Sequence, residues 1–180
     1  VENMVGDETR GWDCAKFLLS NERTGQARVG MSKERIRRLK RIAAETPAGG
    51  RPLIEDIRFR ERLAAVEVEL KALEITTMRV VAAEQKALGD RKPDPASSLL
   101  KVKGSEILQS ISALMVEAAG PYGIAAPVDE EAPEGANEPE IVPDWAAMAQ
   151  PIWMNWRKLS IYGGTNEIQR NIMAKAFLGL

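Results

Sequence analysis

The sequence predicts an all-α protein, an up-down bundle of four helices with a short C-terminal helix. Apolar residues recur at helical spacing over long stretches, and clusters of glycine and proline separate these stretches. No stretch has a convincing strand pattern. Helices joined end to end in this way pack as antiparallel neighbours, which gives the expected bundle.

The first helical stretch covers residues 12–45. Gly25 and Gly30 interrupt it, although a glycine costs a helix about 1 kcal/mol relative to alanine. The pair suggests close approach by another backbone or a ligand, and a packing notch is the commoner cause. The apolar positions counted for this helix are Phe17, Leu18, Ala27, Val29, Ile36, Leu39 and Ile42.

Two further long helices are expected over residues 54–88 and 96–119. Gly89 occupies the C-terminal capping position of the first. Asp94 and Pro95 have the pattern of an N-cap and a first helical residue for the second. Their expected inward-facing residues are Leu63, Val66, Leu70 and Leu73, then Leu100, Ile107, Leu108, Ile111, Leu114 and Met115.

The last third of the chain changes character. Residues 124–144 are rich in acids and prolines and lack basic residues, which predicts a solvated loop. Residues 144–160 are apolar and contain Trp145, Trp153 and Trp156, which either line a pocket or anchor a core or interface. A turn with two glycines then precedes the closing helix.

Composition excludes several classes of function. The net charge of −1 gives no field that attracts nucleic acid or an anionic membrane, and no apolar run is long enough to span a bilayer. The chain has no histidine, the commonest metal ligand and general base. Its single cysteine, Cys14, fits a reducing, cytoplasmic setting. The basic run at residues 33–41 is typical of a solvated helix face.

Two places have candidate chemistry. Glu22 and Arg23 lie inside an apolar stretch, where composition favours a surface ion pair; the alternative is a carboxylate whose pKa burial raises, as a general base requires. Gly163 and Gly164 form either a plain turn or a place where a ligand approaches the backbone. Thr165 is expected to cap the final helix.

The closing segment IYGGTNEIQRNIMAKAFLGL, residues 161–180, closely resembles the end of acyl-CoA dehydrogenases. The opening VGDETRGWDCAKFLLSNERTG resembles the junction between that family's β domain and its C-terminal helical domain, and MVEAAGPYGI resembles its Gln-x-x-Gly-Gly-x-Gly turn. The resemblance implies that residues 1–10 are a tail from a β domain and 11–180 the helical domain, with an acidic loop at 124–144. The absence of an initiator Met agrees with a piece of a longer protein.

The chemistry that this resemblance implies is α,β-dehydrogenation of an acyl-CoA thioester. The family's usual base position is Gly163 here, but some members have glycine there and a glutamate before an arginine on the first helix. Glu22 and Arg23 match that arrangement. The resemblance therefore implies that Glu22 is the base, that the Gly163 N–H binds the thioester carbonyl, and that Arg23, Tyr162 and Gly164 bind substrate.

The resemblance also implies FAD as cofactor, with Thr165, Glu167, Glu117 and Gly120 at family positions that contact it. The family's Arg-x-x-Phe-Gly flavin element has only Arg58 and Phe59 as stand-ins. Implied partners are an acyl-CoA with a bulky or long chain and an electron-transfer flavoprotein or similar acceptor, in a homotetramer or dimer. The fragment alone is expected to be inactive. The alternative is a non-catalytic helical subunit of a hetero-oligomeric acyl-CoA dehydrogenase.

Overall fold

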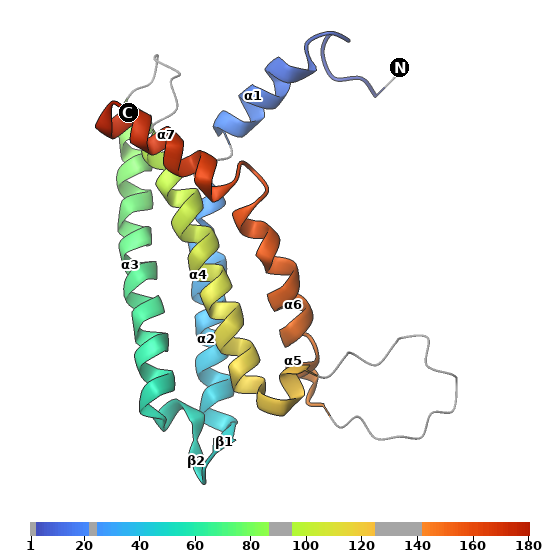
Figure 1. The fold of residues 1–180 in the computed structure, drawn as a ribbon, viewed down its shortest axis with the longest axis vertical. Coiled ribbons are helices and arrows are strands. Elements are labelled where there is room, and N and C mark those ends of the chain that lie inside the picture. Colours follow the sequence, from blue (N-terminus) through green and yellow to red (C-terminus); the bar gives the residue numbers. More distant parts are fainter. Residues whose placement is uncertain (1–2, 22–24, 87–94, 125–141) are drawn as a thin grey trace. The chain divides into compact units, whose positions relative to one another are not determined.

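The computed structural model describes residues 3–21, 25–86, 95–124 and 142–180 (Figure 1). Its α-helices are α1 (Gly11–Asn21), α2 (Val29–Glu45), α3 (Ile57–Lys86), α4 (Ala96–Ala119), α5 (Asp144–Ala147), α6 (Ala149–Asn155) and α7 (Asn166–Leu178). Short 3-10 helices are η1 (Gly25–Ala27), η2 (Leu53–Glu55), η3 (Gly120–Ile124) and η4 (Trp156–Ser160). The strands β1 (Pro47–Ala48) and β2 (Arg51–Pro52) pair antiparallel.

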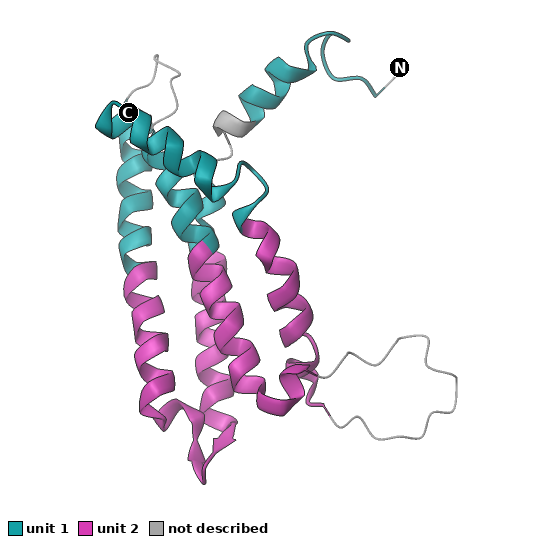
Figure 2. Ribbon diagram, viewed as in Figure 1, with its two compact units in different colours: residues 1–29, 71–105, 160–180 teal, residues 30–70, 106–159 magenta. Residues whose placement is uncertain are grey.

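The chain divides into two compact units (Figure 2). Unit 1 comprises Val1–Val29, Lys71–Ser105 and Ser160–Leu180, and unit 2 comprises Gly30–Leu70 and Glu106–Leu159. The long helices α3 and α4 therefore contribute one part to each unit. The two units are described separately below.

Unit 2 is an up-down helical bundle. Segments of α2, α3, α4 and α6 run side by side with alternating direction (magenta in Figure 2). Their facing sides carry the apolar residues that the helical spacing predicts, so the predicted all-α bundle is confirmed. The buried side chains of this core include Ile36, Leu39, Phe59, Leu63, Leu108, Ile111 and Leu114.

A small hairpin joins α2 to α3, at one of the glycine and proline clusters that separate the helical stretches. Gly49 and Gly50 have φ values of +60° and +84°, a backbone conformation that glycine adopts without a steric penalty. Two successive residues of this kind turn a chain tightly enough for β1 and β2 to pair. The expectation of no strand is therefore wrong at this one place among the described residues.

Unit 1 contains a very close backbone crossing at Gly104 of α4. A Cβ atom at this glycine would lie 2.7 Å from the carbonyl oxygen of Gln26 and 2.8 Å from that of Ala27. Only glycine therefore lets η1 pack directly on α4. Close approach was one expectation for Gly25 and Gly30, but a Cβ at either would meet no atom within 4 Å in the described part of the chain.

The predicted first helix is divided rather than continuous. Arg28 has a φ of +49°, outside the helical range, so η1 and α2 are separate elements. Phe17 and Leu18 of α1, which were counted on the apolar face of this helix, are 62% and 60% exposed. The third long helix has the predicted bounds in α4. The predicted caps Gly89 and Asp94 lie outside the described residues.

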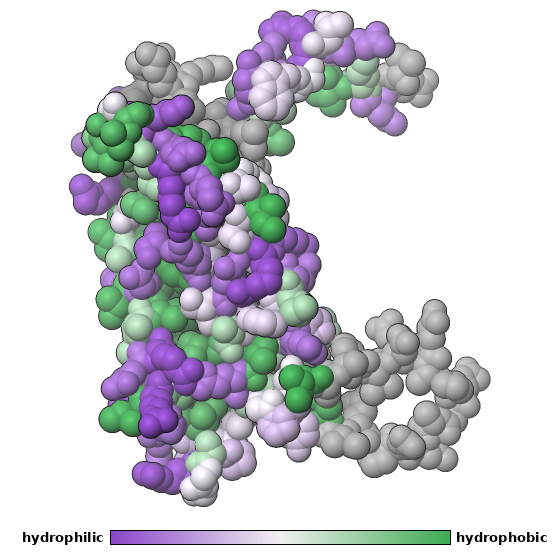
Figure 3. All heavy atoms as spheres, viewed as in Figure 1, coloured by the Kyte–Doolittle hydropathy of each residue, from purple (hydrophilic) through white to green (hydrophobic). Residues whose placement is uncertain are grey.

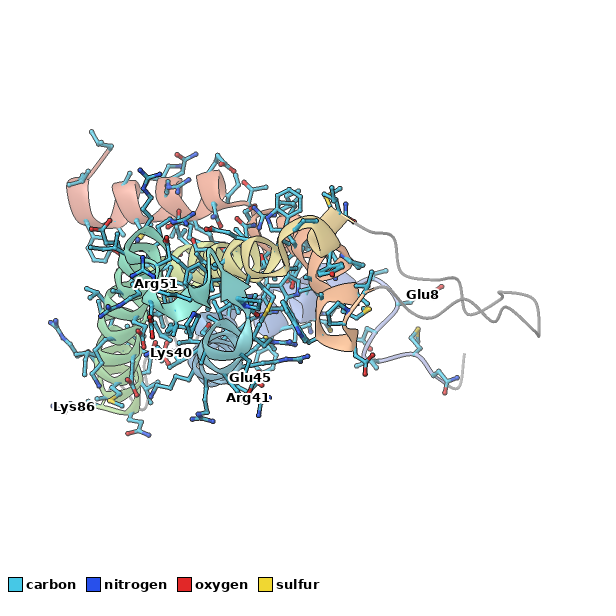
Figure 4. All side chains as sticks on the ribbon, turned by 90° about the horizontal axis from the view of Figure 1, so that it is seen from below. Glu8, Lys40, Arg41, Glu45, Arg51 and Lys86 are labelled. Carbon is cyan, nitrogen blue, oxygen red and sulfur yellow. The ribbon has the colours of Figure 1, made fainter. Side chains whose placement is uncertain are left out.

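Charged side chains cover much of the face drawn in Figure 3, with apolar side chains scattered among them. Lys40 and Arg41 are exposed on α2 (Figure 4), and Lys40 donates a hydrogen bond of 2.6 Å to Glu67. The prediction that the basic run at residues 33–41 forms a solvent-exposed helix face is therefore right for these two residues. Arg35 and Arg38 of the same run are half-buried.

No helix in the described ranges is long and apolar enough to cross a membrane. Across those same ranges, histidine, cysteine, aspartate and glutamate side chains form no group of three or more that could hold a metal ion.

The closely packed Gly104 and the open Gly30 should respond in opposite directions when a methyl group is added to each. Gly104→Ala is expected to destabilise the fold by about 1–3 kcal/mol, because the new Cβ overlaps the η1 carbonyls. Gly30→Ala, the matched control within α2, should stabilise by about 0.5–1 kcal/mol because its site is open. Urea unfolding of both variants measures this. Equal stabilities for wild type and Gly104→Ala would contradict the close crossing.

Candidate functional site

The turn before α7 is built on two glycines and a cap. Gly163 and Gly164 have φ values of +67° and +85°. Thr165 follows in an extended conformation, and its hydroxyl accepts a 3.3 Å hydrogen bond from the N–H of Ile168. The predicted N-cap is confirmed. The two left-handed residues form the turn, and α7 begins at Asn166, directly after the Thr165 cap.

Glutamine side chains lie on both sides of this turn. A Cβ at Gly163 would lie 3.1 Å from Nε2 of Gln26, and one at Gly164 would lie 2.6 Å from Nε2 of Gln169. The Gln169 amide also donates to the Gly163 carbonyl at 3.2 Å. Within the described residues, the Gly163 N–H itself donates no hydrogen bond. The turn thus combines a closely packed backbone with an unused donor.

Tyr162, the residue before the glycines, is held by Arg28, which directly follows η1. Nη2 of Arg28 donates a 2.8 Å hydrogen bond to the Tyr162 hydroxyl. The guanidinium carbon lies 5.8 Å from the centre of the tyrosine ring, a cation–π distance. Both Gln26 and Arg28 therefore tie the segment around η1 to this turn.

A buried polar cluster lies at the first residue of α7. Lys101 and Asn166, each 4% exposed, are joined by a 2.8 Å hydrogen bond from Nζ to Oδ1. Asn166 also donates to the Ser105 hydroxyl at 3.1 Å. Burial lowers the pKa of Lys101 because desolvation disfavours the ammonium form, while the negative charge of Glu167 acts in the opposite direction.

Glu167 is an exposed carboxylate in the first turn of α7. Hydrogen bonds from its own backbone N–H and from the Thr165 hydroxyl hold its pKa below the ordinary value, and Arg170 and Lys101 contribute to the same shift. A negative charge here also complements the positive end of the helix dipole. Glu167 is therefore ionised at neutral pH.

The remaining predicted site residues are placed as follows. Glu22 and Arg23 lie outside the described residues. Glu117, near the end of α4 in unit 2, accepts hydrogen bonds from both terminal nitrogens of Arg62, one of them at 2.5 Å. Gly120 follows α4 with a φ of +55°.

Phe59, one of the two flavin stand-ins, is fully buried in unit 2. Its backbone N–H donates to the Asp56 carboxylate at the start of α3. It is a core residue, which excludes it as a flavin contact. The other stand-in, Arg58, is exposed.

Sequence reasoning missed the residues that fix the turn: Gln26, Arg28, Lys101, Asn166 and Gln169. Lys101 carried a usable signal, because it falls on the inward side of α4 one turn before the buried Ser105 and next to Leu100. A cation at such a position needs a buried acceptor. The roles of Gln26 and Gln169 depend on the fold of the turn and had no local signal.

Comparison with known families agrees with this fold. The profile described as "Acyl-CoA dehydrogenase, C-terminal domain" matches residues 9–178. The chain therefore belongs to the acyl-CoA dehydrogenase family, as a C-terminal helical domain.

Two curated relatives are from Mycobacterium tuberculosis. The acyl-CoA dehydrogenase FadE26 is 29% identical over 182 residues, covering 100% of this chain and 42% of the relative. The acyl-CoA dehydrogenase IpdE1 is 30% identical over 183 residues, covering 98% of this chain and 40% of the relative. The chain thus spans about two-fifths of the length of these relatives.

Solved structures share the fold. A chain of the ChsE4–ChsE5 complex from Mycobacterium tuberculosis superposes with a TM-score of 0.71 at 25% identity, covering 98% of this chain and 42% of that one. Butyryl-CoA dehydrogenase from Megasphaera elsdenii superposes with a TM-score of 0.68 at 21% identity, covering 98% and 41%.

The buried cluster generates a stability prediction. Asn166→Ala should destabilise the protein by about 1.5–3 kcal/mol, because it removes the acceptor of a buried ammonium group. The same change in a Lys101→Met background should cost less, since no buried charge then loses its partner. Asn155→Ala, at the exposed end of α6, is the control. Chemical unfolding measures the double-mutant cycle, and equal costs in both backgrounds would argue against the pairing.

Glu167 generates a pH prediction. Because its pKa is lower in the folded protein, its stabilising contribution is present above the unfolded value of 4.5 and is lost as the pH falls through the folded pKa. Glu167→Gln should therefore lower the melting temperature slightly at pH 7 and leave it unchanged in more acid solution. Thermal unfolding of both proteins across pH 3–7 measures the difference. A difference that is constant over this range would contradict the assignment.

Proposed function

We propose that this chain is the C-terminal domain of an FAD-dependent acyl-CoA dehydrogenase in which Glu22 removes the α-proton of the acyl-CoA thioester. One observation carries this proposal: Gln26, four residues after Glu22, packs against Gly163. The 3-10 helix η1, which contains Gln26, therefore lies beside the turn whose N–H we assign to the thioester carbonyl. This proximity favours a base that comes from the first helical region.

The chemistry of the turn fits this role. Removing a proton next to a thioester carbonyl places negative charge on the carbonyl oxygen, and a fixed N–H donor stabilises that charge. The Gly163 N–H makes no hydrogen bond within the described residues and lies on a half-buried, tightly packed turn. In the proposed reaction the α-proton goes to the Glu22 carboxylate. Arg23, Tyr162 and Gly164 are proposed as further substrate contacts.

Members of this family use FAD, which when bound accepts the β-hydrogen as hydride. The residues around Thr165 suit an uncharged, hydrogen-bonding part of this cofactor, because they offer a hydroxyl and exposed glycine backbone. The ionised Glu167 disfavours a phosphate in the same place. In unit 2, Arg62 balances the charge of Glu117, so a cofactor near Glu117 and Gly120 would not meet an uncompensated carboxylate.

The wider assignment rests on the resemblance. We propose an acyl group that is bulky or long, an electron-transfer flavoprotein or similar acceptor, and a dimer or tetramer formed through the helical domain. The exposed free thiol of Cys14 agrees with a cytoplasmic location. Because the chain spans about two-fifths of its relatives, we expect activity from the whole protein and not from this part alone.

A second candidate is a helical subunit of a hetero-oligomeric acyl-CoA dehydrogenase that does not itself hold the flavin. Two observations favour it. The tight β1–β2 hairpin lies in the connection between α2 and α3, where the family's flavin element is expected, and Phe59 is buried. In addition, one similar structure is a complex of two named components, ChsE4 and ChsE5.

Glu22→Gln in the full-length protein tests the proposal. Mixing with acyl-CoA without oxygen should bleach the flavin about 10²–10⁴-fold more slowly than in wild type, because the general base is gone. Glu45→Gln, at the exposed end of α2 (Figure 4), is the matched control and should leave the rate unchanged.

Near wild-type bleaching by Glu22→Gln would rule out Glu22 as the base. A folded full-length protein that takes up flavin only together with a second, different subunit would select the hetero-oligomeric candidate instead.

A further inference from the structure

Unit 2 contains a cavity of about 250 Å³ that the site described above does not use. It lies among α2, α4, α5 and α6, and its volume equals that of about eight water molecules in the liquid. The residues that define its chemistry are Arg35, Arg38, Ile111, Trp145, Ile152 and Trp156.

Most of the cavity wall is apolar. Trp145 and Ile152 face it from the two short helices, and Ile111 faces it from α4. Trp145 and Trp156 thus line a pocket, which was one of the two readings of the tryptophan-rich segment. Trp153 does not line it, and its ring lies 5.2 Å from the guanidinium of Arg157. An apolar ligand body would displace water from this wall, which favours binding.

Two guanidinium groups from one helix give the cavity a positive side. Arg35 lies over the ring of Trp156 at 5.5 Å, and its Nε is buried without a hydrogen-bond partner. The carboxylate of Glu34 forms an ion pair with this nitrogen at 3.6 Å, which is too long for a hydrogen bond. Within the described ranges, Arg38 makes no ion pair or hydrogen bond. Neither arginine donates a hydrogen bond within the described residues, so the terminal nitrogens of both guanidinium groups are the donors that a ligand would use.

One acidic side chain, Asp144, also lines the cavity. The side chains that line the cavity, two arginines and this aspartate, carry one net positive charge, and Glu34, which pairs with Arg35, lies outside the lining. A positively charged lining suits a ligand with a single negative charge. A carboxylate matches the planar guanidinium fork and can accept two parallel hydrogen bonds from it.

We propose that this cavity binds a small amphipathic carboxylic acid, with its carboxylate at Arg35 and Arg38 and its apolar body against Trp145 and Ile152. The volume suits an aryl or branched acid of about twelve non-hydrogen atoms. This site lies within unit 2 and its occupation does not depend on the role proposed for Glu22.

Calorimetric titration of the full-length protein with 4-phenylbutanoate and with the uncharged 4-phenylbutan-1-ol tests the proposal. The acid should bind saturably at one site and at least about tenfold more tightly than the alcohol, since only the acid forms charge-assisted hydrogen bonds. Arg38→Met should lower the affinity for the acid about tenfold and leave the alcohol unaffected. Arg37→Met, an exposed neighbour outside the lining, should change neither.

Ile152→Trp provides a second variant because it fills the cavity, and it should abolish binding of both compounds. The proposal is overturned if neither compound binds to the wild-type protein, or if acid and alcohol bind equally. It is also overturned if Arg37→Met lowers the affinity for the acid as much as Arg38→Met does. Flavin bleaching by acyl-CoA is measured separately, so failure here and failure of the Glu22 assignment are distinguishable.

Discussion

The backbone crossing at Gly104 is the constraint on which the candidate site depends. The carbonyls of Gln26 and Ala27 approach this glycine so closely that a single methyl group would overlap them. With η1 held at this distance, the Gln26 side chain lies against Gly163. Gly104 and Gly163 therefore serve the same purpose. The missing side chains at both positions leave room for η1, whose backbone packs on Gly104 and whose Gln26 side chain packs on Gly163.

The start of α7 is positioned by a second, electrostatic arrangement. Lys101 is buried, yet its described partner is the neutral amide of Asn166 and not a carboxylate. A cation near the N-terminus of α7 opposes the positive end of the helix dipole. Glu167, ionised and exposed in the same helical turn, offsets both positive contributions. Lys101 therefore anchors the helix through hydrogen bonding, while Glu167 balances its charge.

The bundle was predictable because burial imposes one simple period on each long helix. The bounds of α4 follow from its apolar stripe, and the Thr165 cap follows from local chemistry. The helix break at Arg28 was not predictable, because the spacing of apolar residues does not change where an arginine adopts a left-handed conformation. The exposure of Phe17 shows the same limit, since spacing indicates a possible apolar face but not what covers it.

The site was predictable only as far as the closing motif extends. Two successive glycines, Gly163 and Gly164, predict a turn with left-handed residues. The glutamines beside them could not be predicted in the same way, because Gln26 comes from a distant segment and Gln169 from the following helix. Gly25 and Gly30 are more conspicuous in the sequence than Gly104, yet of these three glycines only Gly104 lies against another backbone segment in the described part of the chain. A close approach depends on which distant segment packs against the glycine, and the residues next to that glycine in the sequence do not identify this segment.

The geometry at Gly163 bears on where a proton-abstracting carboxylate can come from. A side chain at this position would need a φ of +67°, and the Gln26 amide, whose Nε2 lies 3.1 Å from the required Cβ, would have to shift by a few tenths of an ångström. A glutamate placed there would thus be strained and crowded at once. Gln26 lies beside this position, and because residue 163 is a glycine, a base acting at this turn has to come from another residue. The stretch just before η1 is joined to Gln26 by the chain itself, which is the physical reason for assigning the role to Glu22.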